Sequence, residues 1–139
     1  MKQVQTIFDI RTKGQGLYDF THEVSLWTEQ QHFVCGLLTL FIRHTSASLT
    51  IQENADPDVQ FDLNNFFRRF VEENSSLYRH TCEGPDDMPA HIRSALTDVQ
   101  LSIPIVHGAL ALGTWQGIYL FEHRAMAHER QVVAHLIGE

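Results

Sequence analysis

The sequence has few cysteines, few basic residues and no long apolar run. Its 139 residues include two cysteines, Cys35 and Cys82. The first residues show no basic segment followed by an apolar stretch, which a secretion signal would need, so we expect free thiols in a reducing compartment. No window approaches the roughly eighteen consecutive apolar residues of a membrane span. These absences predict a soluble, cytoplasmic protein.

Positive charge is also scarce. The chain carries 10 Lys and Arg against 17 Asp and Glu, which gives a formal net charge of −7. A nucleic-acid-binding protein needs a surplus of Lys and Arg on one face, whereas these basic residues are scattered along the chain. We therefore expect neither a nucleic-acid partner nor a membrane partner.

The length and an apolar content of 43% fit one domain over residues 1–139. Apolar and polar residues alternate from Val4 to Ile10, which predicts a half-buried strand, and a glycine-containing turn follows at 13–16. The nearly continuous apolar run from Gly36 to Ile42 predicts a strand buried on both faces. After Val99 the pattern is strand and turn, with strands expected at 101–106, 109–112, 118–123 and 131–137.

Acid and proline pairs predict the starts of two main helices. Asp56 can accept the free N–H groups of a first turn, and Pro57 is tolerated at the first helical position. Apolar residues then recur at helical spacing and predict a core-facing stripe of Val59, Leu63, Phe66, Phe67 and Phe70. Asp86-Asp87-Met88-Pro89 repeats the capping pattern, and Thr21 is expected to cap a shorter helix. The predicted fold is α+β: one β-rich domain with a mixed or antiparallel sheet, or a sandwich, and two main helices.

The most polar stretch runs from His44 to Pro57, directly after the apolar strand. Polar groups at the end of a rigid strand are well placed for chemistry. Thr45 and Ser46 are candidates for substrate contacts. Glu53 and Asn54 are candidates for proton transfer or substrate orientation, since Asp56 is expected to cap a helix.

Three histidines, His44, His80 and His91, lie beside polar turns. Imidazole combined with carboxylate suits Zn, Ni, Mn or Fe, whereas Mg ordinarily takes more oxygen ligands. If Asp87 lies in the first turn of its helix, His91 is on the same face, and the carboxylate can share a metal or accept the second ring N–H. A helix cap beside a surface histidine explains the same spacing.

The C-terminal half adds further candidates. Glycines bracket Trp115 and Gln116, which permits close approach of a ligand and equally a hairpin with a packed indole. Glu122, a further candidate catalytic carboxylate, shares a strand face with apolar residues, so it needs a partner. Arg93 and Arg124 are candidates for that partner. Both are also candidates for binding phosphate, together with Arg43. Ion pairs on the surface would explain these arginines equally well.

Three motifs together resemble the YjbQ-like family, small uncharacterised proteins often labelled secondary thiamine-phosphate synthase. The motifs are HTSASLTIQENADPDV (His44 to Val59), YRHTCEGPDDMPAHIRSAL (Tyr78 to Leu96) and LGTWQGIYLFEHR (Leu112 to Arg124). The resemblance covers almost the whole chain. Arg93 stands where the family commonly has Lys, which keeps the charge and changes the donor geometry. Cys82 is not part of the family motif and is left out of the candidate site.

The resemblance implies a compact β-rich fold, a homotrimer, and a metal site formed by His44, His80 and the segment from Asp87 to His91. The divalent metal would be Zn or another transition metal, with Mg also open. The implied reaction joins an aminopyrimidine diphosphate to a thiazole phosphate and releases pyrophosphate. In that reaction the metal and the arginines would neutralise the diphosphate, while Trp115 and Gln116 would bind a ring.

The sequence has no glycine-rich loop before a helix, which would be an obvious phosphate cradle for the synthase reaction. Two other functions therefore remain compatible with the same residues. A metal-dependent hydrolase of a phosphorylated metabolite would use Glu53 or Asp87 to activate a water. A non-catalytic trimeric protein would bind a metabolite or a metal without turnover.

Overall fold

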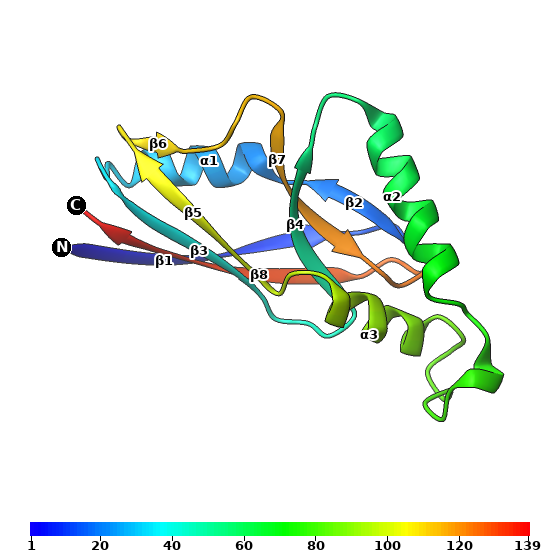
Figure 1. The fold of residues 1–139 in the computed structure, drawn as a ribbon. Helices are drawn as coiled ribbons and strands as arrows, with labels where there is room; N and C mark the ends of the chain where they lie inside the picture. Colours follow the sequence, from blue (N-terminus) through cyan, green and yellow to red (C-terminus); the bar gives the residue numbers. More distant parts are fainter.

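A computed structural model describes residues 1–139 as two curled antiparallel sheets (Figure 1). The larger sheet has the order β1-β8-β3-β5-β6 and the smaller one β2-β7-β4. The larger sheet contains β1 (Lys2–Arg11), β8 (Glu129–Gly138), β3 (Gly36–Ile42), β5 (Gln100–Val106) and β6 (Ala109–Leu110). The smaller sheet contains β2 (Gly16–Asp19), β7 (Gln116–Glu122) and β4 (Ala47–Glu53). The predicted β-rich α+β fold is confirmed.

The hydrophobic core lies between the two sheets and against the helix α1 (Thr21–Gln30). Side chains alternate across a strand, so every second residue of β3 and β5 is buried. The same alternation in β8 buries Arg130 in series with Val132, Ala134 and Leu136. A guanidinium among apolar neighbours requires a buried anionic partner.

The helices α2 (Pro57–Phe70) and α3 (Asp87–Leu96), with the short 3₁₀ helix η1 (Ser75–Leu77), lie at the end of the molecule opposite the two termini (Figure 1). The start of α2 is as predicted, because the Asp56 carboxylate accepts the backbone N–H of Asp58 and Pro57 is the first helical residue. The predicted start of α3 is also found. Its N-cap residue Asp86 makes no capping bond, because its carboxylate binds other groups.

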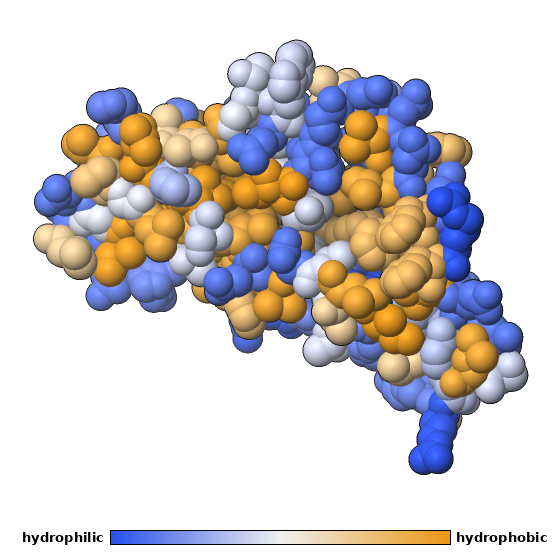
Figure 2. Space-filling model, in the orientation of Figure 1, coloured by the Kyte–Doolittle hydropathy of each residue, from blue (hydrophilic) through white to orange (hydrophobic).

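The predicted core-facing stripe of α2 is wrong. No residue of α2 is buried, and Phe66 and Phe70 stack on each other while remaining 46% and 64% exposed. Phe67 packs edge-on against Phe121 of β7. Figure 2 shows apolar side chains gathered beside this helix, between α2 and β4. Helical periodicity located an apolar face but not the surface that covers it.

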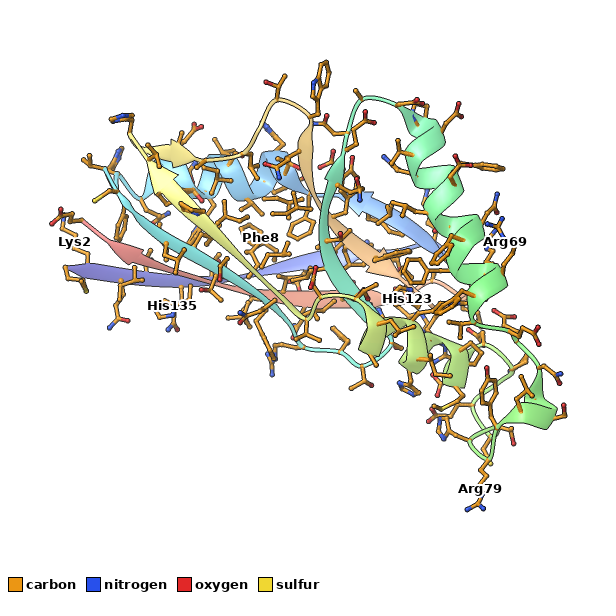
Figure 3. The ribbon with its side chains drawn as sticks, viewed as in Figure 1. Lys2, Phe8, Arg69, Arg79, His123 and His135 are labelled. Atoms are coloured by element: carbon orange, nitrogen blue, oxygen red, sulfur yellow. The ribbon has the colours of Figure 1, made fainter.

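Other local predictions need correction. The polar stretch after His44 contains the strand β4, which pairs with β7 along its length. The strand β2 was not anticipated. Thr21 does not cap α1, because its hydroxyl accepts the backbone N–H of Ile118. Residues 78–82 lie in a loop, and Arg79 of this loop projects into solvent (Figure 3). Both cysteines are free and exposed, and none of the helices has the length and apolarity needed to cross a membrane.

Candidate metal centre

Four potential metal ligands meet at the start of α3. His80 and Glu83 come from the preceding loop, and Asp87 and His91 from the first two turns of the helix. One ligand atom from each of the four residues lies within 4.8 Å of the others. Asp87 and His91 share a helix face because they are four residues apart. A short stretch of chain thus brings two imidazoles and two carboxylates together.

Asp87 is the centre of this cluster. Its residue is only 2% exposed, and its Oδ2 lies 2.6 Å from His80 Nε2 and 3.0 Å from His91 Nε2. Burial raises the pKa of Asp87, but the hydrogen bond from His80, the positive charge of His91 in its protonated form and the charge of Arg124 outweigh burial and lower this pKa to about 2. The carboxylate is therefore ionised at neutral pH.

The second nitrogen of His91 fixes its tautomer. His91 Nδ1 lies 2.8 Å from the backbone carbonyl oxygen of Thr45, which can only accept a hydrogen bond. Nδ1 therefore carries a proton and donates it. In the neutral ring, Nε2 then presents a lone pair to the Asp87 carboxylate, which is also an acceptor. Two facing acceptors are repulsive unless a proton or a metal cation lies between them, and a backbone carbonyl behind the ring is typical of metal-ligating histidines.

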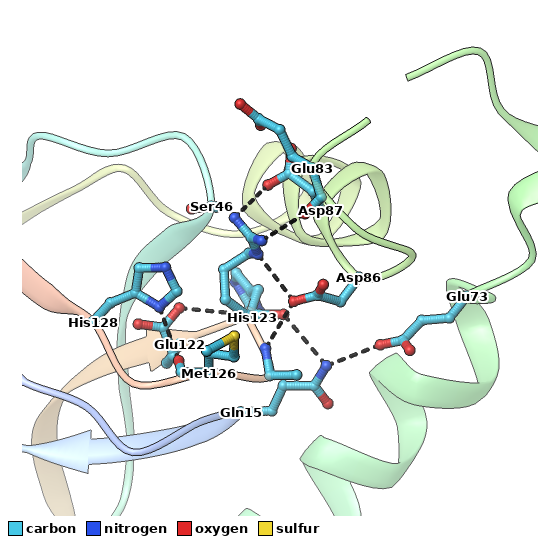
Figure 4. Close-up of polar contacts among 12 residues, drawn as sticks. Gln15, Ser46, Glu73, Glu83, Asp86, Asp87, Glu122, His123, Met126 and His128 are labelled. Atoms are coloured by element: carbon cyan, nitrogen blue, oxygen red, sulfur yellow. Dashed lines mark hydrogen bonds and ion pairs between the residues drawn. The ribbon is translucent and has the colours of Figure 1, made fainter. Parts of the chain in front are cut away.

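Arg124 holds the cluster from behind. Its Nη1 lies 2.8 Å from Asp87 Oδ1, its Nε 2.9 Å from Asp86 Oδ2, and its Nη2 donates to the Glu83 carbonyl. Figure 4 shows Asp86, Asp87 and Glu83 around this guanidinium. Because Asp87 Oδ1 is bound to Arg124, Oδ2 is turned towards the imidazoles. Arg124 thus orients a ligand, and each of its three nitrogens binds an oxygen within the protein.

His44 lies outside this cluster of four. Its Nε2 accepts the backbone N–H of Gln131 at 2.8 Å, so in the neutral ring the proton is on Nδ1. Burial lowers the pKa of His44, and the positive charge of Arg130 lowers it further. With the lone pair of Nε2 used by the backbone, the neutral ring offers an outside group a donor and no free acceptor nitrogen.

An open cavity of about 270 Å³ adjoins the cluster through His91. Its other lining residues are His44, Thr45, Ser94, Ala95 and Val99. The Ser94 hydroxyl donates to the carbonyl of Ala47, so it is turned away as a donor. No Asp, Glu, Lys or Arg lines the cavity. The wall is uncharged apart from any protonation of the two imidazoles.

Glu122 is fully buried in an ion pair with Arg130, in place of the expected Arg93 or Arg124 side chains. Arg130 Nε donates to Glu122 Oε2 at 2.7 Å, and the Thr12 hydroxyl donates to the same oxygen. Burial raises the pKa of Glu122, but its hydrogen bonds outweigh burial and lower it. Ser46 accepts from Arg130 Nη2. The polar side chains of Glu122, Arg130, Thr12 and Ser46 therefore form hydrogen bonds with one another.

The other predicted phosphate-binding arginines differ in position. Arg93 is 3% exposed and donates to the Val71 carbonyl, with Glu73 3.9 Å away. Burial lowers the pKa of Arg93. Arg43 is exposed and donates to the Gln131 side chain. Of the three predicted arginines, Arg43 alone has an exposed side chain without an ion pair.

Four predicted site residues lie at the far end of the smaller sheet. The pairing of Ala47 with Glu122 and of Glu53 with Gln116 puts these pairs at opposite ends of β4 and β7, about 20 Å apart at 3.3 Å per residue. Glu53 accepts the N–H of Asp56, and Gln116 that of Gly113. Asn54 and Trp115 are joined by their backbones. Within one chain this group is separate from the imidazole cluster.

Sequence reasoning missed several residues that build the region. Glu83 and Asp86 flank the predicted ligands, and their acidity within the motif was a usable signal. His123 lies where β7, α2 and α3 come together (Figure 3). It is 1% exposed and lies 2.8 Å from the Ser48 hydroxyl. Burial, with a smaller contribution from the charge of Arg93, lowers the pKa of His123 to about 3.

Comparison with known proteins relates the whole chain to one family. The sequence profile of the family described as "UPF0047 protein YjbQ-like" matches residues 6–139. The chain is 53% identical to UPF0047 protein sll1880 of Synechocystis sp., over 99% of this chain and 94% of that protein. It is 41% identical to UPF0047 protein YjbQ of Escherichia coli O157:H7, over 97% of this chain and 98% of that protein. The crystal structure of hypothetical protein APE1520 from Aeropyrum pernix K1 superposes with a TM-score of 0.89 at 28% identity, covering 98% of this chain and 99% of that one.

Proposed function

Because the chain belongs to the YjbQ-like UPF0047 family, a family of unknown function, we propose the function from its site: a metal-dependent enzyme that acts on a small phosphorylated metabolite. The metal is Zn²⁺ or another transition ion, held by His80, Asp87 and His91. Glu83 is a fourth potential ligand from the same loop. Two imidazoles with carboxylates favour such ions over Mg²⁺.

The observation that carries the proposal is the orientation of His91. Its Nδ1–H donates to the Thr45 carbonyl, and in the neutral ring the Nε2 lone pair faces the Asp87 carboxylate at 3.0 Å. A divalent cation between the two acceptors converts repulsion into coordination. An imidazolium would also satisfy the geometry, so direct metal binding is the first measurement.

The residues of the chain have distinct roles in this proposal. His80 and His91 supply neutral nitrogen ligands, and Asp87 supplies charge. Arg124 keeps Asp87 Oδ2 turned towards the imidazoles. A bound divalent ion supplies Lewis acidity towards phosphate oxygens. The exposed guanidinium of Arg43, next to His44, can add charge to the approach of an anionic substrate.

Within this class, thiamine-phosphate synthase-like transfer is the specific reaction that we propose first. A thiazole nitrogen would form a bond to the pyrimidine methylene carbon while the bond from that carbon to the diphosphate oxygen breaks, releasing pyrophosphate. The centre would bind the departing diphosphate. Trp115 and Gln116 would take part only if another subunit brought them near, since within one chain they lie at the far end of β7.

A homotrimer is part of the proposal, as is a cytoplasmic location. The stacked Phe66 and Phe70 support association, since a folded chain rarely leaves aromatic rings of one helix face so exposed without a covering surface. A subunit interface beside α2 would cover them.

Hydrolysis of a phosphorylated metabolite is the second enzyme candidate. It is favoured by a charged carboxylate, Asp87, within the cluster itself, where it can orient a water. Trimeric binding of a metabolite or metal without turnover uses the same ligands.

The test begins with Zn²⁺, Mn²⁺ and Mg²⁺ titrated calorimetrically into chelator-treated protein. Zn²⁺ is expected to bind with one site per chain, and His91→Ala is expected to lose it. The loaded protein is then assayed for thiamine phosphate and pyrophosphate from the two phosphorylated precursors, and for phosphate release from simple esters. Turnover in one assay selects the reaction; turnover in neither, with intact metal binding, selects the binding protein. Equal metal binding by wild type and His91→Ala would overturn the proposed centre.

A further inference from the structure

We propose that the cavity beside the metal centre binds the uncharged, ring-sized part of an anionic ligand, with His44 Nδ1–H donating a hydrogen bond to that ring. This inference rests on the proposed metal centre and names the ligand class that the centre takes. The ligand carries its phosphate or other oxyanion at the metal end. Its other end is flat, uncharged and equipped with a hydrogen-bond acceptor, as in a nitrogen heterocycle.

The wall of the cavity defines the uncharged end. Ala95 and Val99 contribute apolar surface, and no carboxylate, ammonium or guanidinium lines it. A volume of about 270 Å³ accommodates a single ring with its substituents and is slightly smaller than the usual ligand pocket of about 300 Å³ or more. A phosphate in this cavity would lack a fixed positive charge, so the anionic group belongs outside it.

His91 joins the cavity to the centre and so fixes the orientation of the ligand. Its ring lines the cavity, and its Nε2 belongs to the metal cluster. A molecule that ligates the metal through an oxyanion therefore has its body directed along His91. The metal and the cavity form adjoining halves of one site.

His44 supplies the specific contact. Gln131 N–H donates to its Nε2, which leaves a proton on Nδ1 of the neutral ring, and the bond to Nε2 is the one hydrogen bond that the His44 ring makes within the chain. Because Nδ1 has no partner and is not fully buried, solvent reaches it, and the residue that carries it lines the cavity. An open N–H donor at the edge of an apolar cavity selects a ligand with an acceptor. His44 therefore acts as a ligand-binding residue and not as a metal ligand.

The first test measures binding of phosphonates to Zn²⁺-loaded protein by calorimetry. Methylphosphonate probes the metal alone, benzylphosphonate adds a ring, and the three pyridylmethylphosphonates add an acceptor to that ring. We expect benzylphosphonate to bind about tenfold more tightly than methylphosphonate, and at least one pyridyl isomer to bind more tightly still. Ala95→Phe, at an exposed position of the wall, is expected to remove the advantage of the ring and leave methylphosphonate binding unchanged. Leu96→Phe is the matched control, since Leu96 is exposed on the same helix but does not line the cavity.

The second variant tests the donor. His44→Phe keeps a flat side chain and removes Nδ1–H, so the pyridyl and benzyl compounds are expected to bind equally while Zn²⁺ affinity is retained. Loss of Zn²⁺ affinity in His44→Phe would instead make His44 a metal ligand and overturn the inference. Equal affinities of wild type for methyl and benzyl compounds would also overturn it and leave the metal centre standing. Failure of Zn²⁺ or methylphosphonate to bind at all would overturn the proposed function itself.

Discussion

Two carboxylates at the same end of the molecule are both almost completely buried, yet their surroundings differ. Glu122 accepts hydrogen bonds from Thr12, from the backbone of Arg124 and from Arg130, so both of its oxygens have donors within the chain. Asp87 directs one oxygen to Arg124 and the other to two imidazole nitrogens. One of these imidazoles, that of His91, faces it with a lone pair when the ring is neutral.

The difference shows which kind of buried charge indicates a site. A buried acid surrounded by donors is complete and needs nothing from outside. A buried acid that faces another acceptor requires an additional cation or proton. Glu122 therefore stabilises the junction of β7 and β8, whereas Asp87 is available to a ligand. Burial alone does not separate the two roles, because Glu122 is 0% and Asp87 2% exposed.

The largest effect on the comparison is expected from Glu122→Gln. This change leaves the guanidinium of Arg130 buried without its counter-charge and should destabilise the fold by about 3–5 kcal/mol. Urea unfolding followed by circular dichroism measures the loss. The double variant Glu122→Leu with Arg130→Met should recover much of the stability, since two apolar side chains of similar size replace the pair. A double variant no more stable than Glu122→Gln would contradict this account.

Asp87→Asn is expected to have the next largest effect. This effect is on Zn²⁺ binding and not on folding. The change removes the charged ligand atom between two imidazoles, so Zn²⁺ affinity should fall by about a hundredfold or more, given that outer residues alone contribute 10–100-fold. Calorimetric titration measures it. Asp86→Asn is a neighbouring control that removes a partner of Arg124 and should cost less affinity. Undiminished affinity in Asp87→Asn would place the metal elsewhere.

Arg124→Lys is expected to have a smaller effect of the same kind. Lysine keeps the charge but cannot bind Asp86, Asp87 and the Glu83 carbonyl at once with a planar fork. The orientation of Asp87 should loosen, and Zn²⁺ affinity should fall by about 10–100-fold with one site per chain retained. A drop accompanied by equal loss of thermal stability in the metal-free protein would show that Arg124 acts mainly on folding.

The smallest expected effect is a pH dependence that comes from the buried His123. Burial, followed by the charge of Arg93, lowers the pKa of His123 to about 3. The unfolded chain takes up a proton at this residue near pH 6.5 while the folded chain does not. Stability is therefore fully present well above pH 6.5 and falls as the pH decreases through this value, with a slope that approaches about 1.4 kcal/mol per pH unit for one such group. Urea unfolding of metal-free protein between pH 6.5 and 5 should show this slope, and His123→Gln should show a shallower one.

The fold was largely accessible from local patterns. Alternation predicted β1, the apolar run predicted β3, and Asp56-Pro57 located the start of α2. Errors arose where tertiary contacts decide. The α2 periodicity was correct, but Phe66 and Phe70 are exposed because no sheet covers that side of the helix within the chain.

The candidate site was accessible in part for the same reason. Asp87 and His91 are four residues apart on a helix, so spacing alone brings them together. Glu53 and Trp115 lie within the same family motifs as site candidates, yet strand direction takes them to the far end of the sheet. Arg130 was missed because it lies on a different strand from its partner Glu122, and only the tertiary structure shows that the two side chains pair.

The candidate ligands all lie within residues 80–91, and this has a consequence for local opening of the protein. Such a short segment can unfold and close again without disturbing the ten-residue ladder between β1 and β8. A ligand that binds only the closed segment raises the free energy of this local opening. The free energy of global unfolding remains the upper limit on the protection of any amide. Bound metal should therefore slow amide hydrogen exchange most strongly in the loop before α3 and in its first turns, while amides of the ladder continue to exchange through global unfolding.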